Sequence, residues 1–331
     1  MKGVLVVLEY RIEDGRPVWN RISWEALAAG QELAALTGQP LLAAVAGQSS
    51  EVPAADLACK KLARAYAVEH ELLKNYTADG AILAIEQLLH TVQPACVVFP
   101  HTYQVRDFAP KLAARLGQTL IADVVGLHMD GARPVFVRQL LQGKLNGDYR
   151  HSGDGPCFLS TQAGAFRPDT VESGSCEVEI FRPRLDAASI RSVPGERFRM
   201  SEQTVDLSAA PLIVSVGRGI KEKDNLPIVE ALAEAMGAEL AASRPICDNG
   251  WLPMARQVGS SGQSVSPKVY IAVGISGAIQ HLVGMKGSKT VVAINKDENA
   301  PIFEVADYGI VGDLFEVVPA LTAAVRRAKG A

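Results

Sequence analysis

The sequence is poor in cysteine. Only five thiols occur in 331 residues, an odd number that cannot be used up by disulfide pairing. No two of them stand in a Cys-x-x-Cys arrangement, and the six histidines also lack metal-ligand spacing, so no metal site is expected. We expect buried or uninvolved thiols in a reducing compartment: Cys59, Cys96, Cys157, Cys176 and Cys247.

The chain also lacks an excess of one charge and a long apolar run. Its formal net charge is −3, and no basic block is interleaved with aromatic residues, so no nucleic-acid partner is expected. No apolar stretch approaches the roughly 18–20 residues that a membrane-spanning helix needs. The apolar run that starts at Val4 stops at Glu9, too early for a secretory signal. We therefore expect a soluble, cytoplasmic protein.

Strand and helix patterns alternate from the start of the chain to Gly117. Runs such as 96–99 are apolar on both faces, which indicates parallel strands covered by helices. The predicted strands are 4–8, 41–46, 67–68 and 95–99. The predicted helices are one that Ser23 caps and that ends near Gly38, one over 54–66, one opened by Thr77 or Asp79, and one over 108–116.

A β-rich region follows, from 119 to 181. Asp130-Gly131 and Asn146-Gly147 are strong hairpin signals, Ser173-Gly174 is a weaker one, and 176–181 alternates between apolar and polar residues. We expect antiparallel strands here that complete an N-terminal α/β domain. The linker is placed near 190–206, where prolines and charges replace periodicity, so the N-terminal domain is 1–205.

The strand–helix rhythm returns more tightly in the C-terminal domain, 206–331. Four or five parallel strands in so short a segment predict a doubly wound nucleotide-binding sheet. The fold class is therefore α/β with two domains. The predicted strands are 212–216, 239–242, 269–273, 290–294 and 308–311. The predicted helices are 225–236, which Gly237 ends, a short one that Ser276 caps, 302–306 and 314–328.

Ligands of such a sheet bind beyond the carboxyl ends of the strands, and five segments of this domain fall there. The first, Gly217-Arg218-Gly219, is no dinucleotide fingerprint, because Glu222 stands where the third glycine would be. A tight turn with a surface arginine explains it equally well. The second, Ser243-Arg244-Pro245, fixes an arginine at a strand end, where a surface ion pair is the alternative.

The third segment, 258–264, is a glycine–serine loop whose amides and hydroxyls suit a phosphate or a flavin edge, although a flexible linker has the same composition. The fourth, 274–281, is the most informative. Ser276 is predicted to cap a helix with Gly277 in its first position, so that unpaired amides and the helix dipole favour a pyrophosphate. His281 lies one turn into that helix, where a packed or surface histidine is the alternative.

The fifth segment pairs Asn295 with Asp313, two polar residues at neighbouring strand ends. They can bond a ribose or an adenine, and helix caps and turns explain them equally well. Five adjacent strand ends with ligand-compatible groups predict a dinucleotide crevice. The residues alone do not distinguish FAD from NAD.

The same segments resemble a known family, the α subunits of electron-transfer flavoproteins. The similarity to the family signature is specific from Pro211 to the end of the chain, at 273–281 (VGISGAIQH), 284–286 (GMK), 292–297 (VAINKD) and 300–309 (APIFEVADYG). It continues more weakly through the first domain, at 71–77 (ELLKNYT), 106–110 (RDFAP) and 112–117 (LAARLG).

The resemblance implies FAD in the C-terminal domain. The pyrophosphate would lie at Arg218 and the helix start, the isoalloxazine beside Ser243 and Arg244, and the adenosine half at Asn295, Asp313 and Leu314. Val258 to Ser261 would line flavin N5, and His281 would approach the pyrimidine carbonyl. Arg244, Ser261 and His281 would tune the flavin rather than act as acid–base groups. The whole implied set is Arg218, Ser243, Arg244, Val258, Gly259, Ser260, Ser261, Ser276, Gly277, Ala278, Ile279, Gln280, His281, Asn295, Asp313 and Leu314.

One departure from the family pattern affects the flavin environment. The family's loop usually reads Val-Gly-Gln-Thr-Gly, whereas Ser260 and Ser261 stand here in place of Gln and Thr. Ser261 keeps a hydroxyl for flavin N5, but the glutamine contact is lost. The departure concerns the potential and the bend of the flavin rather than its presence.

The resemblance also implies an electron carrier rather than a substrate-converting enzyme. Such a subunit pairs with a β subunit, accepts electrons from acyl-CoA dehydrogenase-type flavoenzymes and passes them to a membrane-bound quinone reductase. The N-terminal domain would then be scaffold and β-subunit interface. Two alternatives stay open: the α subunit of an electron-bifurcating, NADH-oxidising flavoprotein, and a non-redox nucleotide-binding regulator on the same fold.

Overall fold

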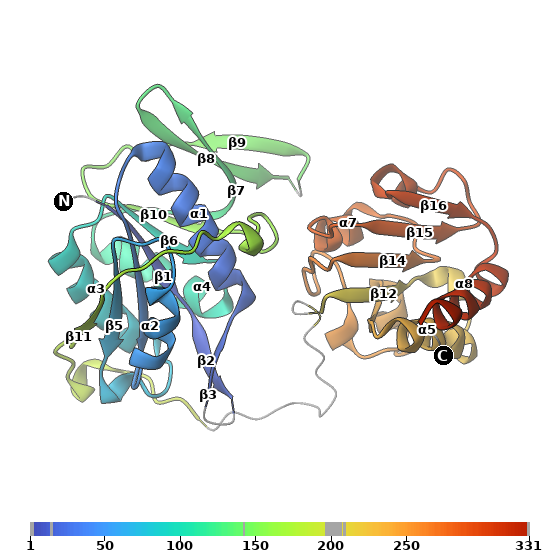
Figure 1. Cartoon of the computed structure of the whole chain (residues 1–331), viewed down its shortest axis with the longest axis horizontal. Helices are drawn as coiled ribbons and strands as arrows, with labels where there is room; N and C mark the ends of the chain where they lie inside the picture. The colour runs from blue at the N-terminus through green and yellow to red at the C-terminus, as the bar shows by residue number, and fades with distance from the viewer. Residues whose placement is uncertain (1–2, 14–15, 142, 196–206, 208–209, 330–331) are drawn as a thin grey trace. The chain divides into compact units, whose positions relative to one another are not determined.

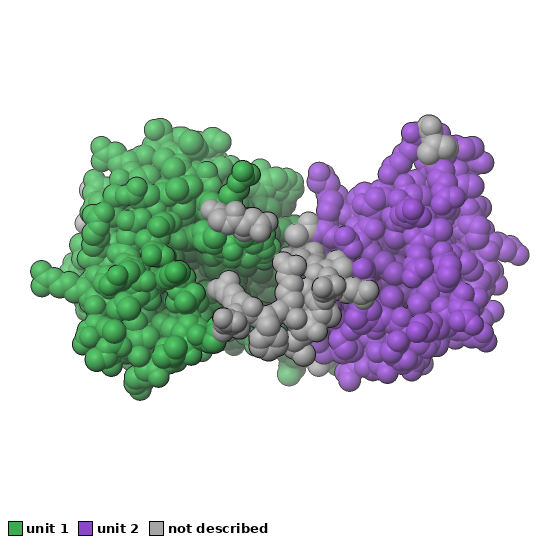
Figure 2. All heavy atoms as spheres, turned by 90° about the horizontal axis from the view of Figure 1, so that it is seen from below, with its two compact units in different colours: residues 1–197 green, residues 198–331 purple. Residues whose placement is uncertain are grey.

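The computed structural model describes residues 3–13, 16–141, 143–195, 207 and 210–329. The chain divides into two compact units, unit 1 at 1–197 and unit 2 at 198–331 (Figure 2). The predicted boundary between 205 and 206 lies outside the described residues, as does most of the predicted linker. Its described part, 190–195, carries no helix or strand.

Unit 1 is built on a nine-stranded sheet in the order β11-β5-β4-β1-β6-β10-β7-β8-β9 (Figure 1). Neighbours are parallel from β11 to β7, while β7, β8 and β9 are antiparallel. The predicted antiparallel strands over 119–181 are therefore confirmed for β7, β8 and β9 and wrong for β10 and β11, which join the parallel part of the sheet. The sheet strands are β1 Val4–Leu8, β4 Leu41–Gly47, β5 Arg64–Glu69, β6 Cys96–Pro100, β7 Leu120–Asp130, β8 Arg133–Leu140, β9 Leu145–Tyr149, β10 Cys157–Thr161 and β11 Val178–Phe181. The other elements are the hairpin β2 Tyr10–Glu13 and β3 Arg16–Trp19, the helices α1 Arg21–Thr37, α2 Glu51–Ala58, α3 Ala78–Val92 and α4 Tyr103–Arg115, and the 3-10 turns η1 Glu71–Leu73, η2 Pro168–Thr170 and η3 Ala187–Ser189.

Strand β1 is the centre of unit 1, and all of its residues are buried. Its side chains alternate between the two faces of the sheet. Val4 and Val6 join the core under α1, while Leu5 and Val7 join the core under α3 and α4. A strand covered on both faces must be apolar throughout, which is why the apolar run of β1 is uninterrupted in the sequence.

Helix α1 is capped by Asn20, so the prediction that Ser23 caps it is wrong. The Asn20 side chain accepts a hydrogen bond from the Ile22 amide at 3.2 Å. Asparagine and serine are both favoured caps, and the earlier residue takes the role. Ser23 is buried instead, and its hydroxyl bonds the amide and the carbonyl of Glu9, each at 2.8 Å. It therefore ties α1 to the end of β1.

The helix predicted over 54–66 exists but has the wrong bounds, and the start predicted for the helix over 108–116 is wrong. Helix α2 ends at Ala58, and residues 64–69 form β5 between β4 and β11. The alanine-rich sequence favours a helix locally, but pairing in the sheet buries Ala65 and Ala67 and overrides that propensity. Helix α4 begins earlier than predicted, after the cap Thr102, whose hydroxyl accepts from the Val105 amide.

Of the three predicted hairpin turns, only Asp130-Gly131 is confirmed, between β7 and β8. Asn146-Gly147 lies inside β9, where Asn146 pairs with Gln139 of β8. Ser173-Gly174 leads into β11, which runs parallel to β5 and therefore forms no hairpin there. Both dipeptides are compatible with extended backbone at a sheet edge, so their composition alone did not determine a turn.

A buried carboxylate secures the loop after β10 to α1. Glu25 is 2% exposed, forms an ion pair with Arg21 Nε at 3.3 Å, and accepts a hydrogen bond from the Gly164 amide at 2.6 Å. Burial raises the pKa of Glu25 to about 7, although the Gly164 and Arg21 contacts oppose the rise.

We expect Glu25→Gln to remove a pH dependence from the stability of unit 1. The folded pKa lies above the unfolded value, so the stabilisation is full below pH 4.5 and is lost as the pH rises through about 7. Between pH 5 and pH 8 the wild-type chain should lose about 2 kcal/mol that the variant keeps. Urea unfolding at the two pH values measures this, and an equal change in both proteins would contradict it.

Unit 2 is the predicted doubly wound sheet, with the parallel order β13-β12-β14-β15-β16. Helices α5 and α8 pack on one face, and α7 lies on the other. No helix among the described residues is long and apolar enough to cross a bilayer. The strands are β12 Leu212–Val216, β13 Glu239–Ala242, β14 Val269–Val273, β15 Val291–Asn295 and β16 Tyr308–Val311. The helices are α5 Leu226–Met236, α6 Arg244–Asp248, α7 Ile279–Met285 and α8 Leu314–Lys329, with the 3-10 turns η5 Arg218–Ile220, η6 Lys223–Asn225, η7 Met254–Arg256 and η8 Pro301–Val305.

Candidate functional site

The loops after β12 and β14 meet backbone to backbone at the carboxyl edge of the unit 2 sheet. The Gly217 amide donates to the Val273 carbonyl at 2.8 Å, and the Gly219 amide donates to the Gly274 carbonyl at 3.0 Å. A Cβ on Gly217 would lie 2.4 Å from that Gly274 oxygen, so only glycine fits. The strand order reverses between β12 and β14, which is where doubly wound sheets bind ligands. Arg218 is exposed at this point.

The turn between β14 and α7 differs from its prediction, because Ser276 does not cap the helix. Helix α7 starts at Ile279 with Ala278 before it. Gly277 has φ +87°, which breaks the helical path, and a Cβ there would lie 2.2 Å from the Ile302 amide nitrogen. The Ile302 amide donates to the Ser276 carbonyl at 3.1 Å. The Ser276 side chain is therefore free of any capping role and exposed.

The glycine–serine loop at 258–264 has a conformation held by hydrogen bonds and is not a flexible linker. The Val258 amide donates to the Ala242 carbonyl at 2.9 Å, and the Ser260 amide donates to the Gln280 carbonyl at 2.7 Å. The buried Gln257 side chain donates to the Ser261 hydroxyl at 2.9 Å. The loop is thus fixed between the end of β13 and the start of α7, with the side chains of Ser260 and Ser261 exposed.

Ser243 and Arg244 occupy the end of β13 and the start of α6. The Ser243 amide donates to the Val216 carbonyl at 2.9 Å, and its side chain is buried. The Arg244 side chain is 66% exposed and pairs with Asp248 Oδ2 at 3.2 Å. The surface ion pair that was the alternative interpretation of this arginine is therefore present, on a largely exposed side chain.

His281 lies in the core of unit 2, not on its surface. It is 6% exposed, and its Nε2 lies 2.9 Å from the hydroxyl of Tyr270 on β14. Burial lowers the pKa of His281 to about 4, and the nearby Val258 carbonyl raises it in part. Its Nδ1 has no hydrogen bond of ordinary geometry within the described ranges. At neutral pH His281 therefore contributes no positive charge, only a hydrogen-bonding nitrogen.

Asn295 and Asp313 both hold local structure. Asn295 Nδ2 donates to the Ile275 carbonyl at 2.9 Å, which joins the end of β15 to the turn before α7. Asp313 Oδ1 accepts from the Phe315 amide at 2.9 Å at the start of α8, and the neighbouring Leu314 is buried. The cap and turn alternative is therefore present at both positions. Asn295 is the last residue of β15, and Asp313 comes shortly after the end of β16.

The structure brings most of the predicted residues to one edge of the sheet, at the ends of β12 to β16. His281, Val258, Gly259, Gly277 and Leu314 are buried behind this edge, whereas Arg218, Arg244, Ser260, Ser261, Ser276, Ala278, Ile279, Gln280 and Asp313 are exposed.

Sequence reasoning missed two supporting residues. Tyr270 bonds His281, and Gln257 holds Ser261 while its own Oε1 is buried without a partner in the described part of the chain. A signal for Tyr270 existed: a tyrosine inside an aliphatic strand must find a partner for its hydroxyl.

Two family models match this chain, and curated relatives match it over nearly its full length. Residues 11–185 match the electron transfer flavoprotein domain, and 206–286 match the electron transfer flavoprotein FAD-binding domain. The electron transfer flavoprotein subunit alpha of Bacillus subtilis is 39% identical over 325 residues, 97% of each chain. That of Mycobacterium tuberculosis is 36% identical over 331 residues, 100% of each chain, and the protein FixB of Clostridium saccharobutylicum is 35% identical over 97% of this chain and 96% of its own. The chain therefore belongs to the family of electron transfer flavoprotein alpha subunits.

Proposed function

We propose that unit 2 binds FAD at the carboxyl edge of its sheet. The observation that carries this proposal is the gathering of polar groups around the glycine contact at the strand-order reversal. One buried polar atom without a partner among the described residues is Oε1 of Gln257, the residue that holds Ser261 at this edge. An unpaired buried polar atom costs roughly 1–3 kcal/mol, which a bound ligand can offset. The residues present therefore fit a polar heterocycle.

The proposed roles follow from where the groups lie. Arg218 and the amides of the turn before α7 would hold the pyrophosphate. Ser243, Arg244 and the loop from Val258 to Ser261 would lie at the isoalloxazine. Asn295, Asp313 and Leu314 would receive the adenosine half. FAD supplies the electron-accepting ring, while these residues bind it, orient it and set the charge around it.

The activity we propose is electron transfer as the α subunit of an αβ heterodimer. Electrons would come from acyl-CoA dehydrogenase-type flavoenzymes and leave to a quinone reductase, with unit 1 as scaffold and β-subunit interface. We also propose that the boundary between the N-terminal domain and the FAD-binding domain lies between residues 205 and 206.

The test is a visible spectrum and a flavin count of the chain co-purified with its β subunit. One bound FAD per pair supports the proposal. Two flavins with NADH oxidation would replace it by the electron-bifurcating form. A colourless pair after incubation with FAD would overturn it in favour of a non-redox nucleotide-binding regulator.

We expect Arg244→Ala to lower the first reduction potential of the bound flavin. Reduction adds negative charge that a nearby cation stabilises, but Arg244 is largely exposed and shares its charge with Asp248. An exposed pair is worth up to about 1 kcal/mol, which corresponds to a fall of roughly 20–40 mV for one electron. A redox titration measures it, with Arg327→Ala on the exposed end of α8 as the control. An unchanged potential would contradict the role of Arg244.

A further inference from the structure

Unit 1 carries two accessible thiols that the proposed electron transfer does not use. Three of the five cysteines are buried, at Cys96, Cys157 and Cys247, whereas Cys59 is exposed and Cys176 is half-buried. Cys59 is the C-cap of α2, and Cys176 lies just before β11, an edge strand of the nine-stranded sheet (Figure 1). A reagent in solution therefore reaches Cys59 first.

The segment before β11 runs along the end of α2 and is bonded to it. The Gly174 amide donates to the Cys59 carbonyl at 3.1 Å. The Cys176 amide donates to the Ala58 carbonyl at 3.0 Å. A Cβ on Gly174 would lie 2.8 Å from the Lys61 Cα, so a glycine is needed for this close approach of the two backbones. Backbone hydrogen bonds thus hold the two cysteines at neighbouring positions.

The sulfur of Cys176 lies at the end of α2. Its thiol donates to the Leu57 carbonyl at 3.6 Å, and the same oxygen accepts at 3.0 Å from the amide of Lys60, the residue after Cys59. One hydrogen bond joins Cys176 to the carbonyl that precedes Cys59, so standard bond lengths place the two α-carbons within roughly 7 Å of each other. Disulfides join α-carbons that are up to about 6.8 Å apart. The pair is therefore within reach of a disulfide.

The two thiols differ in how they can react. Burial raises the pKa of the Cys176 thiol, the Ala65 backbone lowers it in part, and the charge of Cys59 raises it further. The thiolate is the reactive form, so Cys176 is a poor first nucleophile, whereas Cys59 is open to solvent. This difference assigns the first attack to Cys59 and the second to Cys176.

We propose that Cys59 and Cys176 are a redox-sensitive pair that a small-molecule disulfide oxidises to an intramolecular bond, which fastens the segment before β11 to the end of α2. The Cys59 thiolate attacks one sulfur of the small disulfide, forms a mixed disulfide and releases one small thiol. Cys176 then gives its proton to solvent and attacks the Cys59 sulfur, which releases the second small thiol. The pair loses two electrons, and the two small thiols carry them away.

This site is separate from the FAD site of unit 2 and independent of the proposed electron transfer. Reducing compartments keep most thiols reduced, and the disulfides that do form there are usually transient and redox-sensing. A pair with one exposed thiol and one half-buried neighbour suits such a reversible reaction, whereas the three buried cysteines do not.

Peptide mapping by mass spectrometry tests the proposal on the folded, reduced full chain treated with excess oxidised glutathione. A peptide pair joined through Cys59 and Cys176 should form, and dithiothreitol should separate it. Cys96, Cys157 and Cys247 should react at least about tenfold more slowly, because burial keeps the probe away from them.

Two variants and one control assign the order of attack. Cys176→Ser should leave Cys59 as the mixed disulfide with glutathione, because no second thiol displaces it. Cys59→Ser should slow the modification of Cys176 at least about tenfold. Cys247→Ser, in unit 2, should leave the bond between Cys59 and Cys176 unchanged. A wild-type chain in which Cys59 stays unreacted, stops at the mixed disulfide or joins a second copy of the chain would overturn the proposal, and that result needs no variant to fold.

Hydrogen exchange measures the fastening itself. The amides of Gly174 and Cys176 bond the end of α2, and a disulfide opposes the opening of these bonds. Both amides should exchange at least about threefold more slowly in the oxidised chain and return to the original rate after reduction. Equal exchange rates in the two forms would contradict the fastening of this segment.

Discussion

Gly277→Ala should unfold the edge of the unit 2 sheet locally and abolish FAD retention. The residue adopts φ +87°, and a Cβ would meet the Ile302 amide nitrogen at 2.2 Å and the Ile302 Cα at 2.7 Å. Left-handed backbone costs an alanine about 1–2 kcal/mol, and forcing the turn away from η8 adds about 1–3 kcal/mol. The turn before α7 would move, and with it the amides proposed to hold the pyrophosphate.

The control for this variant is Gly250→Ala. Gly250 has a similar φ, +68°, but a Cβ there meets nothing within 4 Å. It should therefore cost only the backbone strain, about 1–2 kcal/mol, and keep FAD. Thermal unfolding and flavin content of the two variants, each co-purified with the β subunit, separate the clash from the strain. Equal losses in both would contradict the assigned contact between Gly277 and Ile302.

Acid should destabilise unit 2 through His281. Burial holds the pKa of this side chain at about 4, below the unfolded value of 6.5. A depressed histidine pKa means that the unfolded state binds the proton more readily. The stability is therefore full above pH 6.5 and is lost as the pH falls through about 4. Between pH 7 and pH 4 the loss should reach about 3 kcal/mol.

His281→Gln should flatten this dependence, since glutamine still offers an oxygen to the Tyr270 hydroxyl but takes up no proton. His90→Gln, on the exposed end of α3, is the matched control and should leave the slope unchanged. Unfolding of unit 2 followed by hydrogen exchange on β14 gives the measurement. A wild-type slope in the His281 variant would show that another group carries the acid sensitivity.

The sheet of unit 2 could be predicted from the sequence because its signals are local and agree with one another. Val269 to Val273 is apolar on both faces and ends at Gly274, so both the strand and its end are readable. The start of α7 could not be predicted from the sequence. Ser276 has the chemistry of a cap, but the φ of Gly277 depends on how closely η8 approaches, and that contact joins residues far apart in the chain.

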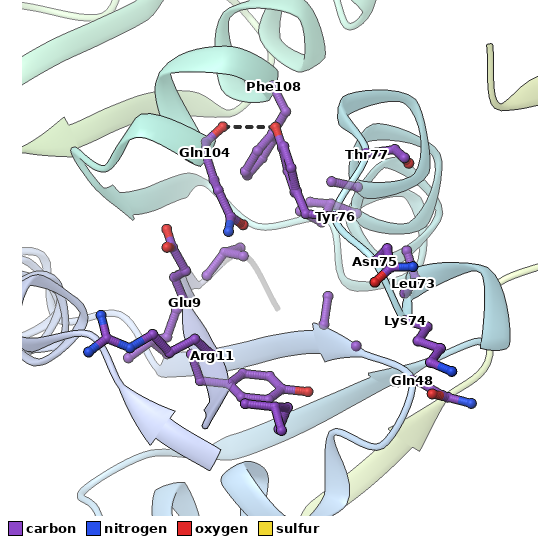
Figure 3. Close-up of a pocket in the computed structure, with 18 of the residues that line it drawn as sticks. Glu9, Arg11, Gln48, Leu73, Lys74, Asn75, Tyr76, Thr77, Gln104 and Phe108 are labelled. Atoms are coloured by element: carbon purple, nitrogen blue, oxygen red, sulfur yellow. Dashed lines mark hydrogen bonds between the residues drawn. The ribbon is translucent and has the colours of Figure 1, made fainter. Parts of the chain in front are cut away.

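The sequence predicted the site as a set of strand ends, but it did not predict the side-chain hydrogen bonds that support the site. Arg244 and Asp313 could be placed at the correct edge because parallel strands end together. The bonds of Tyr270 to His281 and of Gln257 to Ser261 depend on side-chain packing. A cavity in unit 1 was also missed, because Glu9 and Lys74, which both line it, lie far apart in the chain (Figure 3).

The two buried titrating groups give the chain an unusual response to acidity. Glu25 makes unit 1 more stable as protons are added, whereas His281 makes unit 2 less stable over part of the same range. The difference in stability between the two units therefore changes with pH. Through these two side chains, acidification stabilises unit 1 and destabilises unit 2.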